Sequence, residues 1–330
     1  MKEPGRRPPC DPAVAVRPVV AVRPVVVTRE AAQRSMPRVS LPPSRYRPDG
    51  ASDYSHRFHA GNVGDVWKHC VLLEILRHAG EGLARTSYVE SHAGEGGYEL
   101  GPTGEWTEGI GRLWDAEPRA GESDDAVGRY VRRCRELGTG TACPERYPGS
   151  PLLAARALGP DAALALWESD PTACEQLSAA LGSSPHARVT CGDGLAALPA
   201  AVAEADARGD RVVALVDPPF TQKPDWIAVP DAVIAAAAAT RAATILLWYP
   251  VKSLTRPNAM IARFKDAGIA ATLAELVTTP LEHQRQRLNG SGMVLIRPPA
   301  GAIPAIAAAA PLLGARCATR GAWSLRLTSW

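Results

Sequence analysis

The sequence of 330 residues lacks features that would place it in several common classes of protein. It has no apolar run of about 18 residues, the length that a membrane-spanning helix needs, so we expect no membrane partner. Its basic start is broken by proline and arginine and precedes no continuous apolar stretch, which argues against a secretory signal peptide. With 46% hydrophobic and 22% charged residues, the chain is not expected to be wholly disordered. We therefore expect a cytoplasmic protein with a substantial core.

Disulfide and metal frameworks are also absent from the sequence pattern. The seven cysteines are odd in number, and none forms a Cys-x-x-Cys pair. Free thiols in a reducing compartment are the simplest interpretation. Histidines cluster between His56 and His92, but no cysteine or aspartate pattern completes the ligand set of a metal site. We expect no metal, because hydrogen bonds to a cofactor or a nucleic acid suit these histidines better.

Charge and proline divide the chain into two parts. Residues 1–50 contain ten Lys/Arg, four Asp/Glu and ten of the 30 prolines, a net charge of +6. Residues 51–330 contain 27 Lys/Arg and 30 Asp/Glu, a net charge of −3. We predict that residues 1–50 are a disordered, basic, Pro-rich tail, because proline removes backbone donors and favours extended chain. The tail is either a nucleic-acid-binding arm or a dispensable segment from an upstream start, with Met36 as a later candidate.

Residues 51–330 alternate between strand and helix patterns, which predicts a Rossmann-like α/β domain with a mostly parallel, doubly wound sheet. The last strands follow one another with less helix between them, which predicts an antiparallel edge. We interpret about 102–148 as a small helical insertion, because the pattern breaks there and holds a single predicted helix, 124–137. The expected strands are 85–90, 163–167, 187–191, 212–216, 243–248, 270–277, 292–297 and 324–328. The expected helices are 62–79, 171–181, 194–205, 231–240, 258–267 and 303–313.

The tetrapeptide Asp217-Pro218-Pro219-Phe220 is the most specific local signal. It follows the apolar strand 212–216, and ligands of open α/β sheets bind at the carboxyl ends of strands. Asp217 and a backbone carbonyl can accept the two hydrogens of an exocyclic amine such as that of adenine. The prolines fix the direction of that carbonyl, and Phe220 can stack on a flipped base. The alternative is an ordinary Asp-Pro turn that ends a strand.

Three further positions fit a nucleotide-like cofactor. Gly94-Glu95-Gly96 follows the first strand and would allow close approach of a ligand, although position 99 is Glu and not the third glycine of a dinucleotide motif. Glu168 ends the second strand, where Rossmann-like domains place an acid that holds ribose hydroxyls. Asp193-Gly194 follows the third strand, where the acid can accept from an adenine amine. Each acid alone also fits a helix cap.

A basic, glycine-containing run lies near the carboxyl end of the chain. It is predicted to be flexible, and it either contacts phosphates or forms a solvated loop. The run comprises Arg285, Gln286, Arg287, Asn289 and Gly290-Ser291-Gly292.

A colinear set of motifs resembles the RlmJ family, the bacterial 23S ribosomal RNA (adenine(2030)-N6)-methyltransferases. The resemblance covers roughly residues 52–330. It departs from the family at Phe220, where Tyr is usual, and at Glu90-Ser91, where Asp-Thr is usual. The matching segments are 54–62, 65–69, 92–96, 147–151, 193–194, 217–219, 247–251 and 291–293.

The resemblance implies a class I methyltransferase that uses S-adenosylmethionine to methylate N6 of an adenine in 23S ribosomal RNA. Asp217 would be the catalytic acceptor for the amine, and Tyr54 would contact the RNA. We expect a monomer. The residues implied at the S-adenosylmethionine site are His69, His92, Ser150, Glu168, Asp193 and Gly194.

The residues leave other functions open. The Pro-Pro motif also fits a DNA adenine-N6 methyltransferase, and the fold alone also fits a non-catalytic RNA-binding ribosome assembly factor. A protein-glutamine methyltransferase uses a similar turn, but usually with Asn at the position of Asp217. The presence of Asp217 and Gly94 favours the adenine methyltransferase.

Overall fold

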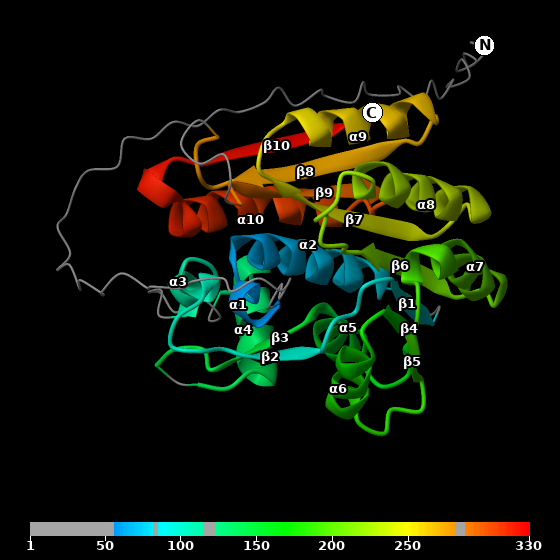
Figure 1. The fold of residues 1–330 in the computed structure, drawn as a ribbon, viewed down its shortest axis with the longest axis horizontal. Helices are drawn as coiled ribbons and strands as arrows, with labels where there is room; N and C mark the ends of the chain where they lie inside the picture. The colour runs from blue at the N-terminus through cyan, green and yellow to red at the C-terminus, as the bar shows by residue number, and fades with distance from the viewer. Residues whose placement is uncertain (1–55, 82–84, 115–122, 141, 282–287) are drawn as a thin grey trace, which may run out of the picture.

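The computed structural model describes residues 56–81, 85–114, 123–140, 142–281 and 288–330 (Figure 1). The predicted tail, residues 1–50, lies outside these ranges, as do Tyr54 and Arg285–Arg287. Eight strands form the main sheet in the order β10-β8-β9-β7-β6-β1-β4-β5, and two form a small sheet, β2-β3. The strands are β1 (Thr86–Glu90), β2 (Gly97–Glu99), β3 (Arg146–Pro148), β4 (Ala163–Glu168), β5 (Ala187–Cys191), β6 (Arg211–Val216), β7 (Thr244–Val251), β8 (Ala271–Val277), β9 (Gly290–Ile296) and β10 (Ser324–Ser329).

The main sheet is parallel at one side and antiparallel at the other. Strands β5, β4, β1, β6 and β7 pair in parallel. Strand β9 runs antiparallel between β7 and β8, and β10 pairs antiparallel with β8, which confirms the predicted antiparallel edge. The strand order reverses between β1 and β6, so the ligand site of such a sheet is expected at the carboxyl ends of these two strands.

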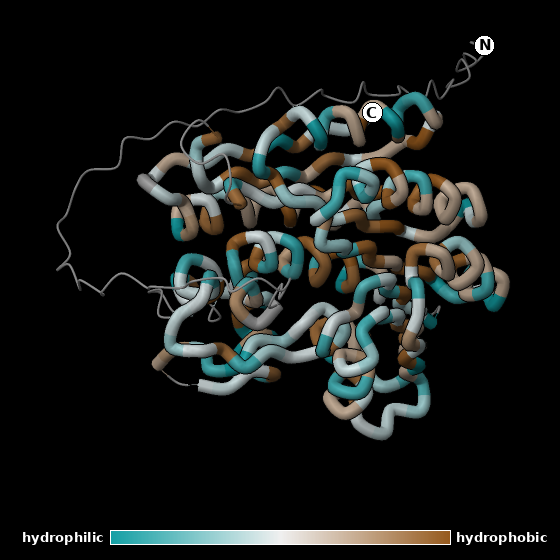
Figure 2. Tube along the Cα trace, viewed as in Figure 1, coloured by the Kyte–Doolittle hydropathy of each residue, from teal (hydrophilic) through white to brown (hydrophobic). Residues whose placement is uncertain are grey.

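Helices cover both faces of this sheet (Figure 1). Helices α2 and α10 pack on one face, and α7, α8 and α9 cover the other. Figure 2 shows hydrophobic residues concentrated along the strands and hydrophilic ones on outward turns. The helices are α1 (His56–His59), α2 (Val63–Ala79), α3 (Gly111–Trp114), α4 (Ala126–Leu137), α5 (Ser150–Leu158), α6 (Pro171–Leu181), α7 (Gly194–Ala207), α8 (Asp225–Ala239), α9 (Thr255–Asp266) and α10 (Ala302–Cys317), with short 3-10 turns η1 (Glu105–Thr107) and η2 (Thr319–Gly321).

Strand β6 shows why apolar runs mark the centre of the sheet. Val213 and Leu215 belong to the core on the α2 side, whereas Val212, Ala214 and Val216 belong to the core on the α7–α9 side. Successive side chains of a strand point to opposite faces, and both faces are covered here. The run is therefore apolar up to Val216, and the first polar residue after it, Asp217, marks the carboxyl end of the strand.

Helix α2 is buried on nearly every side, including at charged positions. It begins at the Asn62 cap, whose side chain accepts from the Asp65 N–H at 3.0 Å. Lys68 and Glu74 are 6% and 1% exposed, because the sheet lies on one side and α4, α5 and α10 lie around the others. Charges this deeply buried need partners of opposite charge or hydrogen-bond partners. Their positions on α2 are therefore candidates for a functional site.

Several local predictions need correction. Helix α8 begins at Asp225, not at 231, because Pro230 is accommodated inside the helix as a buried residue. Gly290–Gly292 is not a flexible run but the start of buried strand β9. Strands β2 and β3 and helix α5 lie between β1 and β4, where the sequence pattern predicted only one helix. No helix in the described ranges is long and apolar enough to cross a membrane.

Candidate active site

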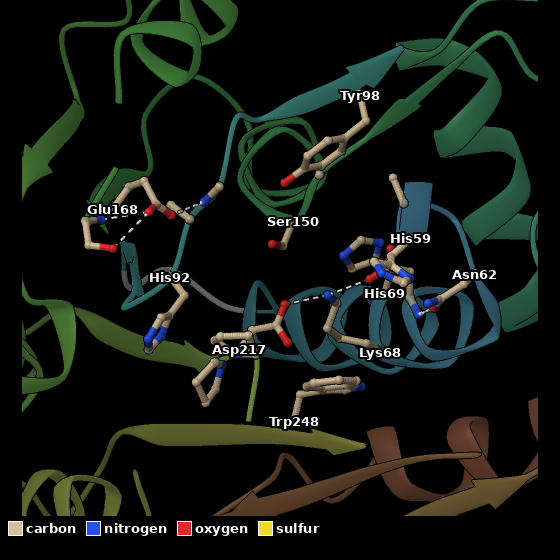
Figure 3. Close-up of a pocket in the computed structure, with 18 residues that line it drawn as sticks. His59, Asn62, Lys68, His69, His92, Tyr98, Ser150, Glu168, Asp217 and Trp248 are labelled. Carbon is tan, nitrogen blue, oxygen red and sulfur yellow. Dashed lines mark hydrogen bonds and ion pairs between the residues drawn. The ribbon is translucent and has the colours of Figure 1, made fainter. Parts of the chain in front are cut away.

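A cavity opens at the point where the strand order reverses (Figure 3). The loops after β1, β4 and β6 form one side of it, and α2 and the start of α5 form the other. We call it the inner cavity. The residues that carry the argument below are Lys68, His69, His92, Ser150, Glu168, Asp217 and Trp248, all of which line it.

Asp217 is held by a buried charge cluster at the floor of the inner cavity. The Lys68 amino group donates to Asp217 Oδ2 at 2.5 Å and lies 2.7 Å from Asp65 Oδ1. Burial alone would lower the pKa of Lys68, but the charges of Asp217 and Asp65 outweigh it and raise that pKa above its ordinary value. Lys68 therefore stays a cation, fixes one Asp217 oxygen and leaves the other, Oδ1, outside that contact.

Trp248 closes the inner cavity beside this cluster. The Lys68 amino group lies 5.6 Å from the centre of the Trp248 ring, a cation–π distance. The Trp248 indole donates to Ser291 Oγ at 2.6 Å, and the Ser291 hydroxyl donates to the Gly64 carbonyl at 3.2 Å. The ring is thus fixed from behind, and Figure 3 shows it lying across the cavity from Ser150.

A second buried hydrogen-bond network lies across the inner cavity from Trp248. Ser150 Oγ donates to Glu90 Oε1 at 2.5 Å, and Tyr88 donates to Glu90 Oε2 at 2.9 Å. Glu90 is fully buried, and burial raises its pKa to about 8 despite these two hydrogen bonds. The carboxyl group therefore sets the direction in which the Ser150 hydroxyl points.

His69 faces the inner cavity as a neutral side chain. Burial, together with the positive charge of Lys68, lowers the pKa of His69 to about 3. Its Nδ1 lies 2.7 Å from the Tyr147 hydroxyl, which lies 3.0 Å from the Tyr130 hydroxyl. Its Nε2 is buried and has no hydrogen-bond partner among the described residues. An unpaired polar atom in a cavity wall suits a bound ligand that supplies the partner.

Glu168 fixes the glycine-rich turn that follows β1. Gly94 N–H donates to Glu168 Oε2 at 2.8 Å, and the Ser169 and Asp170 amides donate to Oε1 at 2.7 and 3.0 Å. Gly94 has φ +63, and a Cβ there would lie 2.2 Å from the Tyr98 hydroxyl. A side chain at position 94 would therefore displace Tyr98, which favours glycine there. Glu168 Oε1 accepts from two amides, whereas Oε2 accepts from Gly94 alone and keeps a lone pair for another donor.

The other predicted cofactor residues lie around this turn. His92 lines the inner cavity, its Nδ1 lies 2.8 Å from Ser91 Oγ, and burial lowers its pKa. Asp193 and Gly194 do not line the inner cavity. Asp193 is exposed and caps α7 by accepting from the Ala196 N–H at 3.0 Å. Gly194 packs on the turn, since a Cβ there would lie 2.1 Å from the Ser91 carbonyl oxygen.

Phe220 lies in a neighbouring cavity and not in the inner one. It is 6% exposed, has a positive φ of 47 and packs on Trp226 with ring centroids 4.5 Å apart. We call the space beyond it the outer cavity, lined by Phe220, Trp226, Trp248, Lys252, Arg256 and others. Stacking of Phe220 on a base stays a prediction, as does the contact of Tyr54, which lies outside the described residues.

Sequence reasoning missed the residues that fix the side chains lining the inner cavity. Lys68 and Asp65 belong to a quoted motif but received no role, and Glu90, Tyr98 and Trp248 were not proposed as site residues. One signal could have found the first two. Asp65 and Lys68 are charged residues three apart on a helix whose neighbouring positions are mostly apolar. Glu90, by contrast, meets Ser150 only through the fold.

The described histidines have separate surroundings. His59 lies 2.9 Å from Glu105, and His78 lies 3.1 Å from Glu81. Within the described ranges, no group of three or more His, Cys, Asp or Glu residues could hold a metal ion.

The sheet order, with β9 reversed between β7 and β8, is that of a Rossmann-like methyltransferase fold, and the inner cavity lies at its switch point. The crystal structure of protein LPL1258 from Legionella pneumophila is similar to this chain. The two superpose with a TM-score of 0.72 and 25% sequence identity, over 82% of this chain and 98% of that one. The predicted fold class is confirmed.

Sequence comparison identifies the family. The family described as ribosomal RNA large subunit methyltransferase D, RlmJ, matches residues 84–329, and the chain belongs to it. Proteins named ribosomal RNA large subunit methyltransferase J from Haemophilus influenzae and Escherichia coli are each 33% identical to it. These matches extend over 252 and 254 residues, 74% of this chain and 87% of each relative. The resemblance seen in the sequence is confirmed.

Proposed function

We propose that this protein uses S-adenosylmethionine to methylate N6 of an adenine in large-subunit ribosomal RNA, at the position that corresponds to adenine 2030. The observation that carries the proposal is the meeting of Asp217-Pro218 with the Gly94–Glu168 turn in one cavity. The names of the two curated relatives add the substrate class. An adenine amine and a nucleoside cofactor both fit this combination.

The residues of the inner cavity suit S-adenosylmethionine. Glu168 Oε2 keeps a lone pair that can accept a ribose hydroxyl, and Gly94, which donates to the same oxygen, lines the same cavity. On the far side, His69 Nε2 and the Ser150 hydroxyl offer polar contacts for the amino-acid end. We propose His92, Asp193 and Gly194 as further cofactor-binding residues by family resemblance. When bound, S-adenosylmethionine supplies a methyl group on a positively charged sulfur.

The chain's own residues then act on the adenine amine. The Asp217 oxygen that Lys68 does not bind, Oδ1, accepts one N6 hydrogen, and the Pro218 carbonyl accepts the other. Both contacts place electron density on nitrogen and aim its lone pair at the methyl group. A bound S-adenosylmethionine would supply the methyl group to this nitrogen, and Asp217 would be the adjacent acceptor for the proton that the nitrogen then loses. Lys68 keeps the Asp217 carboxylate in this orientation.

The test is methyl transfer by an Asp217→Ala variant on protein-free 23S RNA. Removing a group aligned with the reacting atom is expected to lower kcat by about 10²–10³ or more, while S-adenosylhomocysteine binds as in the parent. Asp161→Ala removes a carboxylate far from the cavity and should leave both values unchanged. Parent-like methyl transfer by Asp217→Ala would remove the basis of the proposal.

Two further measurements separate the alternatives. Equal or better methylation of duplex DNA in competition with RNA would favour a DNA adenine methyltransferase. Cofactor binding without turnover on RNA or DNA would favour a non-catalytic assembly factor. Mapping N6-methyladenine in ribosomal RNA from cells with and without the gene would test the nucleotide position.

A further inference from the structure

The outer cavity continues from the inner one at the Asp217-Pro218-Pro219 turn. His59, Asn62, Pro219 and Trp248 line both cavities, so the two share a wall. The outer cavity has a volume of about 690 Å³, which lies within the range of sites for small organic ligands. A nucleotide whose base reaches Asp217 from this side would leave its sugar and phosphates in the outer cavity.

One wall of the outer cavity is aromatic and fixed. Phe220 packs on Trp226, and Trp226 lies edge-on to Tyr249 with ring centroids 6.5 Å apart. The Tyr249 hydroxyl donates to the buried Glu275 at 2.7 Å, which also accepts from Arg326 at 2.8 Å. The wall is thus anchored through β7 and β8 to the edge strand β10. A rigid aromatic surface of this kind suits nucleobases, because every base has a π-face.

The wall formed by the β7–α9 connection is basic. Lys252 and Arg256 are exposed and line the cavity, and neither forms an ion pair with an acid within the described ranges. Helix α9 has no acidic residue in its first turn. The acid on the opposite side, Glu105, is already engaged, lying 2.9 Å from both His59 Nδ1 and the Asn62 amide nitrogen. Two cations without acidic partners, at the start of a helix, favour an anion.

We propose that Lys252 and Arg256 bind the RNA backbone phosphates that flank the target adenosine. This inference rests on the proposed function, because it assumes that the base enters from the outer cavity. The role is one of substrate positioning: the phosphate contacts hold the strand, the aromatic wall receives a base, and Asp217 reaches the amine.

The first test is a Lys252→Ala/Arg256→Ala double variant, measured with 23S RNA at several salt concentrations. We expect KM for RNA to rise by about tenfold, with kcat at saturating RNA within about twofold of the parent. The salt slope of RNA affinity should fall by roughly 1.4–1.8, since two phosphate contacts are lost. S-adenosylhomocysteine binding, measured by calorimetry, should not change.

The matched control is Arg241→Ala/Lys265→Ala. It removes the same charge from two exposed positions, one before β7 and one in the last turn of α9, and neither lines the outer cavity. The control should keep the parent KM and salt slope. Equal effects in the two double variants would mean that only net charge matters, and would overturn the proposal.

A second test assigns the contact to particular phosphates. An RNA with one uncharged methylphosphonate next to the target adenosine should bind the parent more weakly than normal RNA does. The double variant should discriminate less between the two RNAs, because the partner cations are gone. If the double variant discriminated between the two RNAs as strongly as the parent does, the effects of the mutations and of the methylphosphonate would be additive, which would contradict the proposal. If the parent fails to methylate RNA at all, the proposed function fails first, so the two failures are distinguishable.

Discussion

The inner and outer cavities share a wall but differ in their charged residues, which are buried and paired in the inner cavity and exposed in the outer one. In the inner cavity, Lys68 is buried between Asp65 and Asp217, and Glu90 is buried against two hydroxyls. In the outer cavity, Lys252 and Arg256 are exposed and have no acidic partner among the described residues. The difference suits two tasks. Groups that act on reacting atoms need fixed geometry, whereas groups that hold a polyanion need accessible charge.

The largest expected effect comes from breaking the buried pair. Lys68→Met removes the cation and leaves Asp65 and Asp217 without their partner. Removing one member of a buried ion pair typically lowers the free energy of unfolding by about 3–5 kcal/mol. We also expect kcat to fall by about 10²-fold or more, because Asp217 loses its fixed orientation. Urea denaturation and single-turnover methyl transfer measure the two effects.

Lys265→Met is the matched control for Lys68→Met. Lys265 is exposed on α9 and lies over the Trp330 ring at 5.3 Å, so its loss should change stability by less than about 1 kcal/mol. Similar stability losses in the two variants would show that the inner cluster is no more important to the fold than a surface cation.

The second effect depends on pH. Glu90 has a pKa of about 8 in the folded protein, above the ordinary 4.5 of an unfolded chain, because it is buried. Between these values the folded state holds a proton that the unfolded state has released. The free energy of unfolding should therefore fall as pH rises from about 4.5 to 8, by up to about 1.4 kcal/mol per pH unit, and level off above 8.

Glu90→Gln removes this titration while keeping the size of the side chain. Relative to the parent, the variant should gain stability steadily from pH 5 to 8 and then keep a constant difference. Urea denaturation of both proteins at pH 5, 6.5, 8 and 9 measures it. Parallel pH profiles for the two proteins would contradict the interpretation of Glu90 as a buried, largely protonated group.

The elements of the sheet were predictable because their signals are local. Helix α6 and strand β5 match their expected bounds, and the apolar run of β6 located Asp217 at a strand end. The insertion was less predictable. Strands β2 and β3 are three residues each, and they pair across nearly 50 positions of polar, glycine-containing chain.

The site was predictable in part, and for a physical reason. Glu168 and Asp217 lie where strands end, so the strand pattern predicts their edge of the sheet. The partners of these groups come from elsewhere in the chain: Gly94 lies 74 positions before Glu168, and Lys68 lies 149 positions before Asp217. Such contacts exist only after folding, and no local pattern encodes them. The assignment of catalytic and cofactor roles to these residues stays a prediction.

The smallest expected effect tests how tightly the inner cavity is built. Gly94 and Gly182 both have φ +63, but a Cβ at Gly94 would lie 2.2 Å from the Tyr98 hydroxyl, whereas one at Gly182 would have nothing within 4 Å. Gly182→Ala should cost only the backbone penalty, about 1 kcal/mol. Gly94→Ala should cost about 1 kcal/mol more, because the Tyr98 ring must shift, and it should weaken S-adenosylhomocysteine binding by about tenfold. Calorimetric titration and urea denaturation of both variants separate the two contributions. If both variants lose the same stability and bind the ligand equally well, the turn tolerates a side chain, and the inner cavity is less tightly built than its contacts indicate.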